Sequence, residues 1–434
     1  MNRLFHIAIW LAMPLWVIAC IMLASAAHAS NYGCRNLDQI REMPVLEGKS
    51  GVFFRIQSDL RMDHRVSDEV IELLARLRRA LEARGTLLVY VPVPTKGLAM
   101  PHVLPREAEL YGYDAMIGTR VFDDLVKRMK AAGVLAVNPL QHMQKLPSDK
   151  APFFHADFHW TPSGAHAAAL AVGETLSGHP AVRNQAKIRF QTRETGMKTA
   201  FSGQRRIMQK YCAKALPLPR AMGFETRKDQ PVETLDLFGE QHVQAVLVGT
   251  SFSDSDISNF AGFLSQELGL EVQNHALTGG NQFGAITDYL ISDEFNENPP
   301  KLLIWENPIY NSLTRFSAQP MDELIAAAQR HCPTALHVQD DEDGAFVSLF
   351  DEIEAGNSLS VRIQPPGQRR LVVRFTNAAG ETITKTLTRS ERQAASTRFF
   401  MPLSGLGKGR WDKVTFLGAK PVEVALCSDQ KGEI

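Results

Sequence analysis

The sequence predicts an α/β domain, in which helices flank a parallel sheet, followed by an all-β sandwich. Three observations indicate this fold class. Helix-period segments alternate with short apolar runs up to about residue 331, short β-rich runs with Pro-Gly and Gly turns fill the remainder, and 434 residues suffice for two domains. We therefore place the α/β domain at 30–331 and the sandwich at 332–434, after a targeting segment at 1–29.

Helix-to-strand units recur through the α/β half. A helix is predicted over 70–81 behind the cap candidate Ser67, and it feeds a β-rich run at 87–93. A second helical face at 121–129 feeds a run at 134–137 in the same way. Two more buried strands are predicted at 245–248 and 302–305, and a helix is expected around 256–268.

The boundary of the C-terminal part is placed near Cys332, and the acidic stretch at 340–343 is interpreted as a surface connection. The β-rich runs lie at 359–363, 371–376, 382–387, 398–403 and 414–417, with a further run ending at Cys427. Short strands at regular spacing are typical of a sandwich.

The basic residues are concentrated in this C-terminal part, although the formal net charge of the chain is zero. Between 358 and 420, twelve Lys and Arg accompany three acidic residues. Such an excess indicates either a solvated sheet face or a surface that binds a polyanion. The candidates for contacting such a polyanion are Arg369, Arg370, Arg374, Lys385, Arg398, Lys408 and Arg410, with Trp411 as a ring that could stack on it.

The first 29 residues have the pattern of a secretory signal. A basic start at Arg3 precedes an apolar run at 4–23 and the cleavage motif Ala27-His28-Ala29. An uncleaved membrane anchor and a lipoprotein signal at Cys20 are the alternatives. The small residues before the motif favour cleavage, which would place the mature chain in the periplasm.

Four cysteines remain after such a cleavage, an even number in an oxidising compartment. They allow three disulfide connectivities. Two disulfides are the natural interpretation, and pairing Cys34 with Cys212 and Cys332 with Cys427 would give each domain one of them, although the sequence alone leaves the connectivity open.

The segment 155–162 carries the most chemistry. In an extended chain, residues two apart face the same way, so Asp157 and His159 can lie side by side, with the carboxylate orienting the imidazole. Thr161 and Pro162 have the residue types of a helix cap and a first helical position. A metal site including His155 is the alternative, but no ligands from further elements accompany it, so we expect no metal.

Ser251 is the candidate nucleophile because it follows the predicted strand 245–248 and Gly249. The carboxyl ends of strands are where open α/β sheets bind their ligands, and a following helix would direct its amides at an oxyanion. Gly280 and Asn281, in a small-residue loop, are further oxyanion candidates, although such a loop is also an ordinary turn.

Asp157-Phe158-His159-Trp160-Thr161-Pro162 ahead of Gly249-Thr250-Ser251-Phe252-Ser253 resembles the alginate O-acetyltransferase family of AlgX and AlgJ. Ordinary SGNH hydrolases carry the serine first and the histidine motif last. This family has the permuted order, and here the serine follows the histidine by about ninety residues. The resemblance extends over nearly the whole chain, and the C-terminal β-domain matches the AlgX branch better.

The resemblance implies an SGNH-hydrolase-like fold and a Ser251, His159 and Asp157 triad, with Tyr310 in the position of an active-site tyrosine of the family. It also implies a C-terminal carbohydrate-binding module. One departure is Phe252, where family members tend to carry tyrosine.

These residues predict a periplasmic O-acetyltransferase that acts on an acidic exopolysaccharide, with alginate as the polymer implied by the resemblance. A carbohydrate acetyl esterase and a non-catalytic scaffold for polymer export are the alternatives. We expect no cofactor, no nucleic-acid partner and a monomer. The resemblance further implies acetyl delivery by membrane and periplasmic acetylation proteins, and contact with other polysaccharide export proteins.

Overall fold

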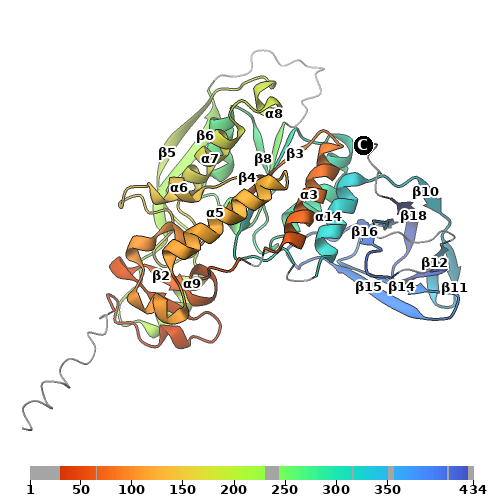
Figure 1. Ribbon diagram of the computed structural model, residues 1–434, viewed down its shortest axis with the longest axis horizontal. Coiled ribbons are helices and arrows are strands. Elements are labelled where there is room, and N and C mark those ends of the chain that lie inside the picture. Colours follow the sequence, from red (N-terminus) through yellow and green to blue (C-terminus); the bar gives the residue numbers. More distant parts are fainter. Residues whose placement is uncertain are drawn as a thin grey trace, which may run out of the picture.

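The computed structural model describes residues 30–64, 66–229, 244–314, 317–349, 356–407 and 410–428. The α/β part and the C-terminal sandwich lie beside each other, with α3 (Asp68–Glu82) and α14 (Gln319–Gln329) between the parallel sheet and the sandwich (Figure 1). The predicted signal at 1–29 lies outside the described residues. Within the described ranges, no helix combines the length and apolar character needed to cross a membrane.

Five parallel strands form the central sheet, in the order β4-β3-β9-β7-β8. Their bounds are β3 (Leu87–Val93), β4 (Leu135–Ala136), β7 (Ala245–Val248), β8 (Val272–Asn274) and β9 (Leu302–Pro308). The strands predicted at 87–93 and 245–248 have these bounds, whereas β8 was missed because its three residues carry a single buried side chain. All carboxyl ends therefore face one edge of the sheet.

Helices cover the sheet on both sides. In Figure 1 the sheet lies between α7 (Pro162–Leu176) on one side and α3 with α14 on the other. The predicted caps are confirmed, because Ser67 accepts a hydrogen bond from the N–H of Val70 and Thr161 accepts one from the N–H of Gly164. The other long helices are α5 (Ala115–Ala131), α11 (Phe260–Leu268) and α12 (Gly284–Ile291).

Several short helices connect these elements. They are α2 (Ile56–Asp59), α4 (Lys96–Ala99), α6 (Leu140–Gln144), α8 (Pro180–Arg183), α9 (Gly203–Met208), α10 (Ser251–Asp254) and α13 (Asp293–Glu297). A small antiparallel pair, β1 (Val45–Glu47) and β2 (Phe53–Arg55), precedes α2.

A two-stranded ribbon that the sequence did not predict projects from the α/β part. β5 (Phe190–Thr199) pairs with β6 (Arg220–Lys228) in an antiparallel register, and α9 lies in the connection between them. Both strands carry mostly exposed or half-exposed side chains. The ribbon therefore lacks the apolar alternation from which strands are usually predicted.

The C-terminal sandwich consists of a four-stranded and a five-stranded antiparallel sheet. The first sheet contains β10 (Thr334–Leu336), β13 (Ser358–Ile363), β16 (Arg398–Pro402) and β18 (Pro421–Cys427). The second contains β11 (Gln339–Asp341), β12 (Gly344–Ser348), β14 (Arg370–Thr376), β15 (Thr382–Thr388) and β17 (Lys413–Leu417). The acidic stretch at 340–343 was wrongly interpreted as a connection, because it forms the β11–β12 hairpin.

Two disulfides join residues far apart in the chain. Cys34 is bonded to Cys212, and Cys332 is bonded to Cys427, so of the three connectivities that the sequence leaves open the structure has the one that gives each domain a disulfide. The first links the N-terminal segment to the connection inside the ribbon. The second links the segment after α14 to the last strand of the sandwich.

A polar interface holds the sandwich against α14. Arg389 and Glu323 form a bidentate ion pair with N–O distances of 2.5 and 3.0 Å, and both side chains are buried. Nearby, Gln319 donates to the Thr386 carbonyl. The two parts are therefore joined by specific buried contacts as well as by the chain.

Candidate active site

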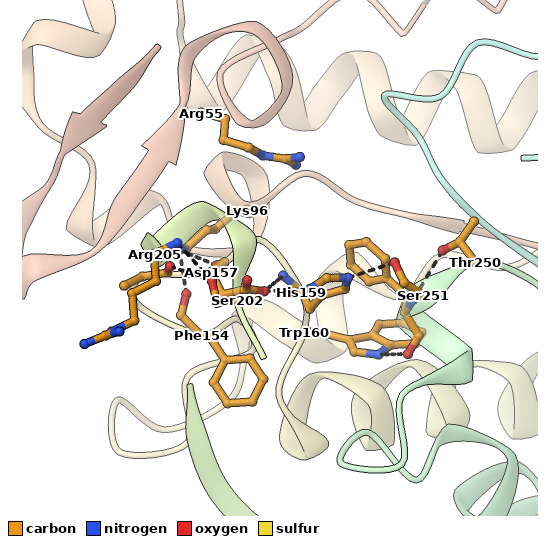
Figure 2. Close-up of polar contacts among 12 residues, drawn as sticks. Arg55, Lys96, Phe154, Asp157, His159, Trp160, Ser202, Arg205, Thr250 and Ser251 are labelled. Atoms are coloured by element: carbon orange, nitrogen blue, oxygen red, sulfur yellow. Dashed lines mark hydrogen bonds and ion pairs between the residues drawn. The ribbon is translucent and has the colours of Figure 1, made fainter. Parts of the chain in front are cut away.

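Asp157, His159 and Ser251 form a continuous hydrogen-bonded chain, shown in Figure 2. Asp157 Oδ1 lies 2.6 Å from His159 Nδ1, and His159 Nε2 lies 2.8 Å from Ser251 Oγ. The carboxylate is buried, whereas the His159 side chain keeps 22% of its surface exposed. The structure thus brings together the three residues that the motifs singled out, with one end of the chain open to solvent.

The loop that carries Asp157 and His159 is a tight turn, so the expectation of an extended segment is wrong. Phe153 pairs with Trp160, and the Phe154 N–H donates to the His159 carbonyl, which closes the loop. Asp157 and His159 nevertheless lie together, because Asp157 Oδ1 also accepts from the His159 backbone N–H at 2.8 Å. A local turn therefore replaces strand alternation as the cause of their proximity.

Ser251 is the first residue of α10, directly after β7. Thr250 caps this helix, and its N–H donates to Glu306 Oε2 on the neighbouring strand β9 at 2.8 Å. Gly249 is required here because an added Cβ would lie 2.5 Å from the same oxygen. The nucleophile turn is therefore fastened to the centre of the sheet.

Glu306 is a fully buried carboxyl that sequence reasoning missed. It accepts hydrogen bonds from the backbone and hydroxyl of Thr250 and from the Ser253 hydroxyl. Burial raises the pKa of Glu306 to about 7, although the hydrogen bonds from Thr250 and Ser253 oppose the rise. Its signal was its position, a carboxyl inside an apolar strand beside the serine strand.

Burial also acts on the pKa of Asp157, but here the opposing interactions are stronger than the effect of burial. Burial alone would raise the pKa of this carboxyl, but the hydrogen bond from His159 and the charge of that imidazole outweigh it. The pKa of Asp157 therefore lies below its usual value. An ionised Asp157 is the form that holds Nδ1 of His159 protonated and leaves Nε2 to face the serine.

Two aromatic rings pack against the imidazole of His159. The Phe158 ring centroid lies 4.1 Å from that of His159, and the Phe252 centroid lies 5.0 Å away. Phe252 is 2% exposed and also packs on Trp160, whose Nε1 donates to the Phe252 carbonyl at 2.7 Å. The side chain that follows the nucleophile is thus a core group.

Tyr310 lies near this site, beyond the carboxyl end of β9. Its ring faces the guanidinium of Arg55, whose Cζ lies 4.7 Å from the Tyr310 centroid and 4.2 Å from that of Phe158. Arg55 itself makes a bidentate contact with the buried Asp59. Tyr310 is therefore connected to His159 through Arg55 and Phe158, and Arg55 is a further residue that the sequence did not indicate.

The two oxyanion candidates lie in a loop beside the nucleophile turn, since the Leu277 N–H donates to the Gly249 carbonyl. The Gly280 N–H donates to the Leu277 carbonyl at 3.2 Å, so that donor is engaged within the loop. Asn281 is exposed, and its side-chain oxygen accepts from the Phe283 N–H. The Asn281 amide nitrogen is the group of this loop that stays a candidate.

Lys96 is another buried group that motif analysis missed. It follows the carboxyl end of β3, and its Nζ donates to four backbone carbonyls, three of them in the loop that carries Asp157. The signal was a lysine in an otherwise apolar stretch next to a predicted strand end. The strand ends of β3, β7 and β9 thus all contribute to the site.

The predicted polysaccharide-binding residues divide into exposed and internal groups. Arg369 and Arg370 are exposed, Arg374 is half-buried, and Arg410 pairs with Asp412 at the surface. Arg398 pairs with Asp293 of the α/β part at 3.1 Å. Lys408 lies outside the described residues.

Two of these candidates are corrected, because the half-buried Lys385 has its ammonium engaged within the sandwich and Trp411 is buried in the sandwich core. Lys385 donates to the carbonyls of Pro402 and Ser404, and burial lowers its pKa to about 8. Trp411 is 5% exposed and packs edge-on against Phe375 in the sandwich core. Neither side chain presents its functional surface to a polymer.

No group of three or more His, Cys, Asp or Glu side chains that could hold a metal ion occurs in the described part of the chain. His155, Asp157 and His159 therefore do not converge on a common point, and the alternative of a metal site at this loop is not supported. The His155 carbonyl instead accepts from Lys96 and from the Phe53 N–H.

The chain resembles known proteins in sequence and in fold. The family model for the SGNH hydrolase-like domain of the acetyltransferase AlgX matches residues 45–309. The chain is 33% identical over 299 residues to the alginate biosynthesis protein AlgX of Pseudomonas putida, a match that covers 67% of this chain and 61% of the relative. It is 31% identical over 248 residues to the probable alginate O-acetylase AlgJ of Pseudomonas fluorescens, covering 54% of this chain and 59% of the relative. The matches thus span about three fifths of these relatives.

The solved structure of AlgX from Pseudomonas aeruginosa has the same fold. It superposes with a TM-score of 0.77 over 93% of this chain and 99% of that chain, at 24% sequence identity. The resemblance predicted from the motifs and the predicted fold class are both confirmed. The chain therefore belongs to the family of SGNH hydrolase-like acetyltransferase AlgX domains.

Proposed function

We propose that this chain is a serine-dependent O-acetyltransferase, exported to the periplasm, that acetylates hydroxyl groups of an acidic polysaccharide. The observation that carries the proposal is the hydrogen-bonded chain from Asp157 through His159 to Ser251. Alginate is the polymer we propose, because relatives of this chain are named as alginate biosynthesis and alginate O-acetylase proteins.

The geometry suits a two-step acyl transfer. His159 Nε2 removes the proton of Ser251 Oγ as the oxygen attacks the carbonyl of an acetyl donor, and the donor's leaving group takes that proton as it departs. A sugar hydroxyl then attacks the acetyl-serine while His159 accepts its proton, and collapse of the intermediate returns that proton to Ser251. Asp157 keeps the imidazole oriented and stabilises its protonated form.

Both steps develop negative charge on the acetyl oxygen. Ser251 is the first residue of α10, a helical position whose backbone N–H has no carbonyl partner within the helix. We propose this N–H and the side-chain amide of Asn281 as the oxyanion donors. Removing a single donor of this kind typically lowers kcat by about 100-fold to 1000-fold.

Transfer to a sugar requires that the polymer compete with water. Binding a long chain raises the local concentration of its hydroxyls and orients them. Arg392 of the sandwich supports such a path, because it reaches the loop beside the nucleophile: an added Cβ at Gly279 would lie 2.9 Å from the Arg392 Cγ. We propose that Arg369, Arg370, Arg374 and Arg410 contact the polymer further along.

Purified mature chain incubated with 4-nitrophenyl acetate and polymannuronate oligomers tests the proposal. We expect acetylated oligomers by mass spectrometry, and we expect Ser251→Ala to lower their formation to the rate without enzyme. The variant removes the hydroxyl that accepts the acetyl group in the Asp157–His159–Ser251 hydrogen-bonded series. We expect the fold to tolerate this change, since Ser251 is a half-buried surface residue.

Two other outcomes would contradict it. Release of acetate with no acetylated oligomer would identify a carbohydrate acetyl esterase. Unchanged acetylation by Ser251→Ala, together with loss of polymer export when the sandwich is deleted, would identify a non-catalytic scaffold. In the cell, we expect membrane and periplasmic acetylation proteins to deliver the acetyl groups that 4-nitrophenyl acetate supplies in this assay.

A further inference from the structure

Lys96 occupies an unusual environment for a lysine. It begins α4, shortly beyond the carboxyl end of strand β3, and its side chain is completely buried. Its Nζ lies 5.6 Å from the centroid of the Phe54 ring. A lysine is almost never fully buried unless its ammonium has partners.

Four backbone carbonyls supply those partners. Lys96 Nζ donates to Phe154 O at 2.6 Å, Phe53 O at 2.8 Å, His155 O at 2.9 Å and Asp157 O at 3.0 Å. Figure 2 shows the ammonium at the centre of the turn, on the side of Asp157 away from His159. Three of the four acceptors belong to residues 154–157, so one ammonium fixes the path of the backbone into the triad.

Two carboxylates and one further cation surround the ammonium of Lys96. Asp59 and Asp157 attract its ammonium, and Arg55, which is paired with Asp59, repels it. Arg55 and Asp59 come from the β2–α2 segment, and Asp157 and the half-buried His155 come from the loop. Two cations and two carboxylates thus form a buried group with no net charge, which contains the terminal member of the triad.

We propose that Lys96 is a positioning residue that holds the loop 154–157 so that the Asp157 carboxylate meets His159 at hydrogen-bonding distance. The inference rests on the proposed function, because positioning has meaning only if Ser251 is acylated. Lys96 acts through Asp157, because its ammonium donates to these backbone carbonyls of the loop that carries that carboxylate.

The hold of Lys96 on the loop should depend on pH, because protonation sets the number of N–H groups that the side chain can donate. An ammonium has three donors for the four carbonyls, whereas a neutral amine has two, and buried carbonyls left without a donor are costly. Burial lowers the pKa of Lys96 to about 7, against the attraction of Asp59 and Asp157. Deprotonation should therefore loosen the loop as the pH rises above that value.

The test compares acylation of Ser251 in the wild type, Lys96→Met and Lys96→Arg, using the full mature chain. A sulfonyl fluoride that labels serine, quantified by mass spectrometry, measures Ser251 reactivity, and 4-nitrophenyl acetate gives kcat and KM from about pH 5 to about pH 9. Leu371→Ala, in the core of the sandwich, is the control for a general loss of stability.

Lys96→Met should lower kcat and the labelling rate about 100-fold, with KM changed less than about threefold, because a displacement near 1 Å has this effect on an aligned catalytic group. The wild type should lose activity on the alkaline side. Lys96→Arg keeps its charge and should not show that loss. The Leu371→Ala control should label at the wild-type rate.

Equal labelling of Lys96→Met and wild type, or a deficit matched by Leu371→Ala, would overturn the inference and leave the proposed function standing. If Lys96→Met does not fold, the pH profile of wild-type activity is the deciding measurement. Wild-type activity that stays constant above about pH 7 would also overturn the inference. Absence of a Ser251 adduct in the wild type would overturn the proposed function and this inference with it.

Discussion

At the scale of single residues, two buried ionisable groups hold the two halves of the candidate site from opposite sides. The carboxyl of Glu306 accepts the hydrogen bonds of the nucleophile turn, and the ammonium of Lys96 donates to the loop of Asp157. Neither group was predicted from the sequence. A motif shows the residues that react, but the groups that hold them lie on strands 87–93 and 302–308 or just beyond, and only the fold brings them near.

Glu306→Gln should change the pH dependence of stability. The pKa of Glu306 rises from 4.5 to about 7 on folding, so its contribution is complete below about pH 4.5 and is lost as the pH rises through about 7. A neutral amide keeps the shape without this loss. Relative to wild type, the variant should gain on the order of 3 kcal/mol between pH 4.5 and alkaline pH, measured by urea unfolding.

The comparison at two pH values separates this effect from a general change in stability. Parallel stability curves for wild type and Glu306→Gln would show that folding does not raise the pKa of Glu306. Exposed Glu423→Gln is the control for the Glu→Gln change as such, since this carboxyl lies at the surface of the sandwich.

At the scale of elements, the loop before α7 and the short helix α10 form one unit. Trp160 ends the loop, its indole packs on Phe252 and Phe260, and its N–H donates to the Phe252 carbonyl at 2.7 Å. Because His159 precedes Trp160 and Ser251 precedes Phe252, this one hydrogen bond joins the neighbours of the base and of the nucleophile. It should fix the distance between Nε2 and Oγ.

Trp160→Phe keeps an aromatic ring and removes that hydrogen bond. Leaving the buried Phe252 carbonyl without its donor costs about 1–3 kcal/mol, and we expect kcat for 4-nitrophenyl acetate to fall about tenfold. Stopped-flow measurement of the acylation burst checks the step affected. A wild-type burst rate would show that backbone packing alone fixes the distance.

Trp411→Phe is the matched control for this substitution. Trp411 is equally internal but lies in the sandwich core, and its indole nitrogen is among the buried polar atoms without a hydrogen-bond partner in the described structure. The same chemical change there removes no hydrogen bond and should leave the acylation burst unchanged.

The elements that could be predicted are those with a local signature. Buried strands such as β3 and β7 are continuous apolar runs, and α3 and α7 begin at side chains of capping type. The ribbon β5–β6 could not be predicted, because its strands carry polar, exposed residues and are paired across about twenty intervening residues. The turn at 154–159 was mistaken for an extended segment. Asp157 and His159 lie close together because one oxygen of the Asp157 side chain contacts both the backbone N–H and the imidazole of His159, and strand alternation plays no part.

At the scale of the whole molecule, the α/β part and the sandwich meet through a buried ion pair. Arg389 and Glu323 are each about 4% exposed, and they connect the end of β15 to α14. The excess of basic residues in the sandwich was visible in the sequence, but the division of its arginines between the interface and the surface was not. That division depends on which strand faces α14.

Glu323→Gln should destabilise the protein by about 3–5 kcal/mol, because it leaves the buried Arg389 guanidinium without its hydrogen-bonded counter-charge. Differential scanning calorimetry checks the result. The exposed pair of Arg362 and Glu423 is the control, where the same Glu→Gln change should cost less than about 1 kcal/mol. A small effect at both sites would show that water reaches the interface.

The bond between Cys332 and Cys427 also determines how the protein responds to mechanical load. It joins residues 95 positions apart, and Ser428, immediately after it, donates to the carbonyl of His331 just ahead of Cys332. Tension applied to the chain beyond the sandwich would pass straight across this bond to α14 and bypass every strand between. With this disulfide formed, pulling on the two ends of the sandwich should not extend the segment between Cys332 and Cys427. Reduction of the disulfide would allow that segment to unfold and lengthen under the same load.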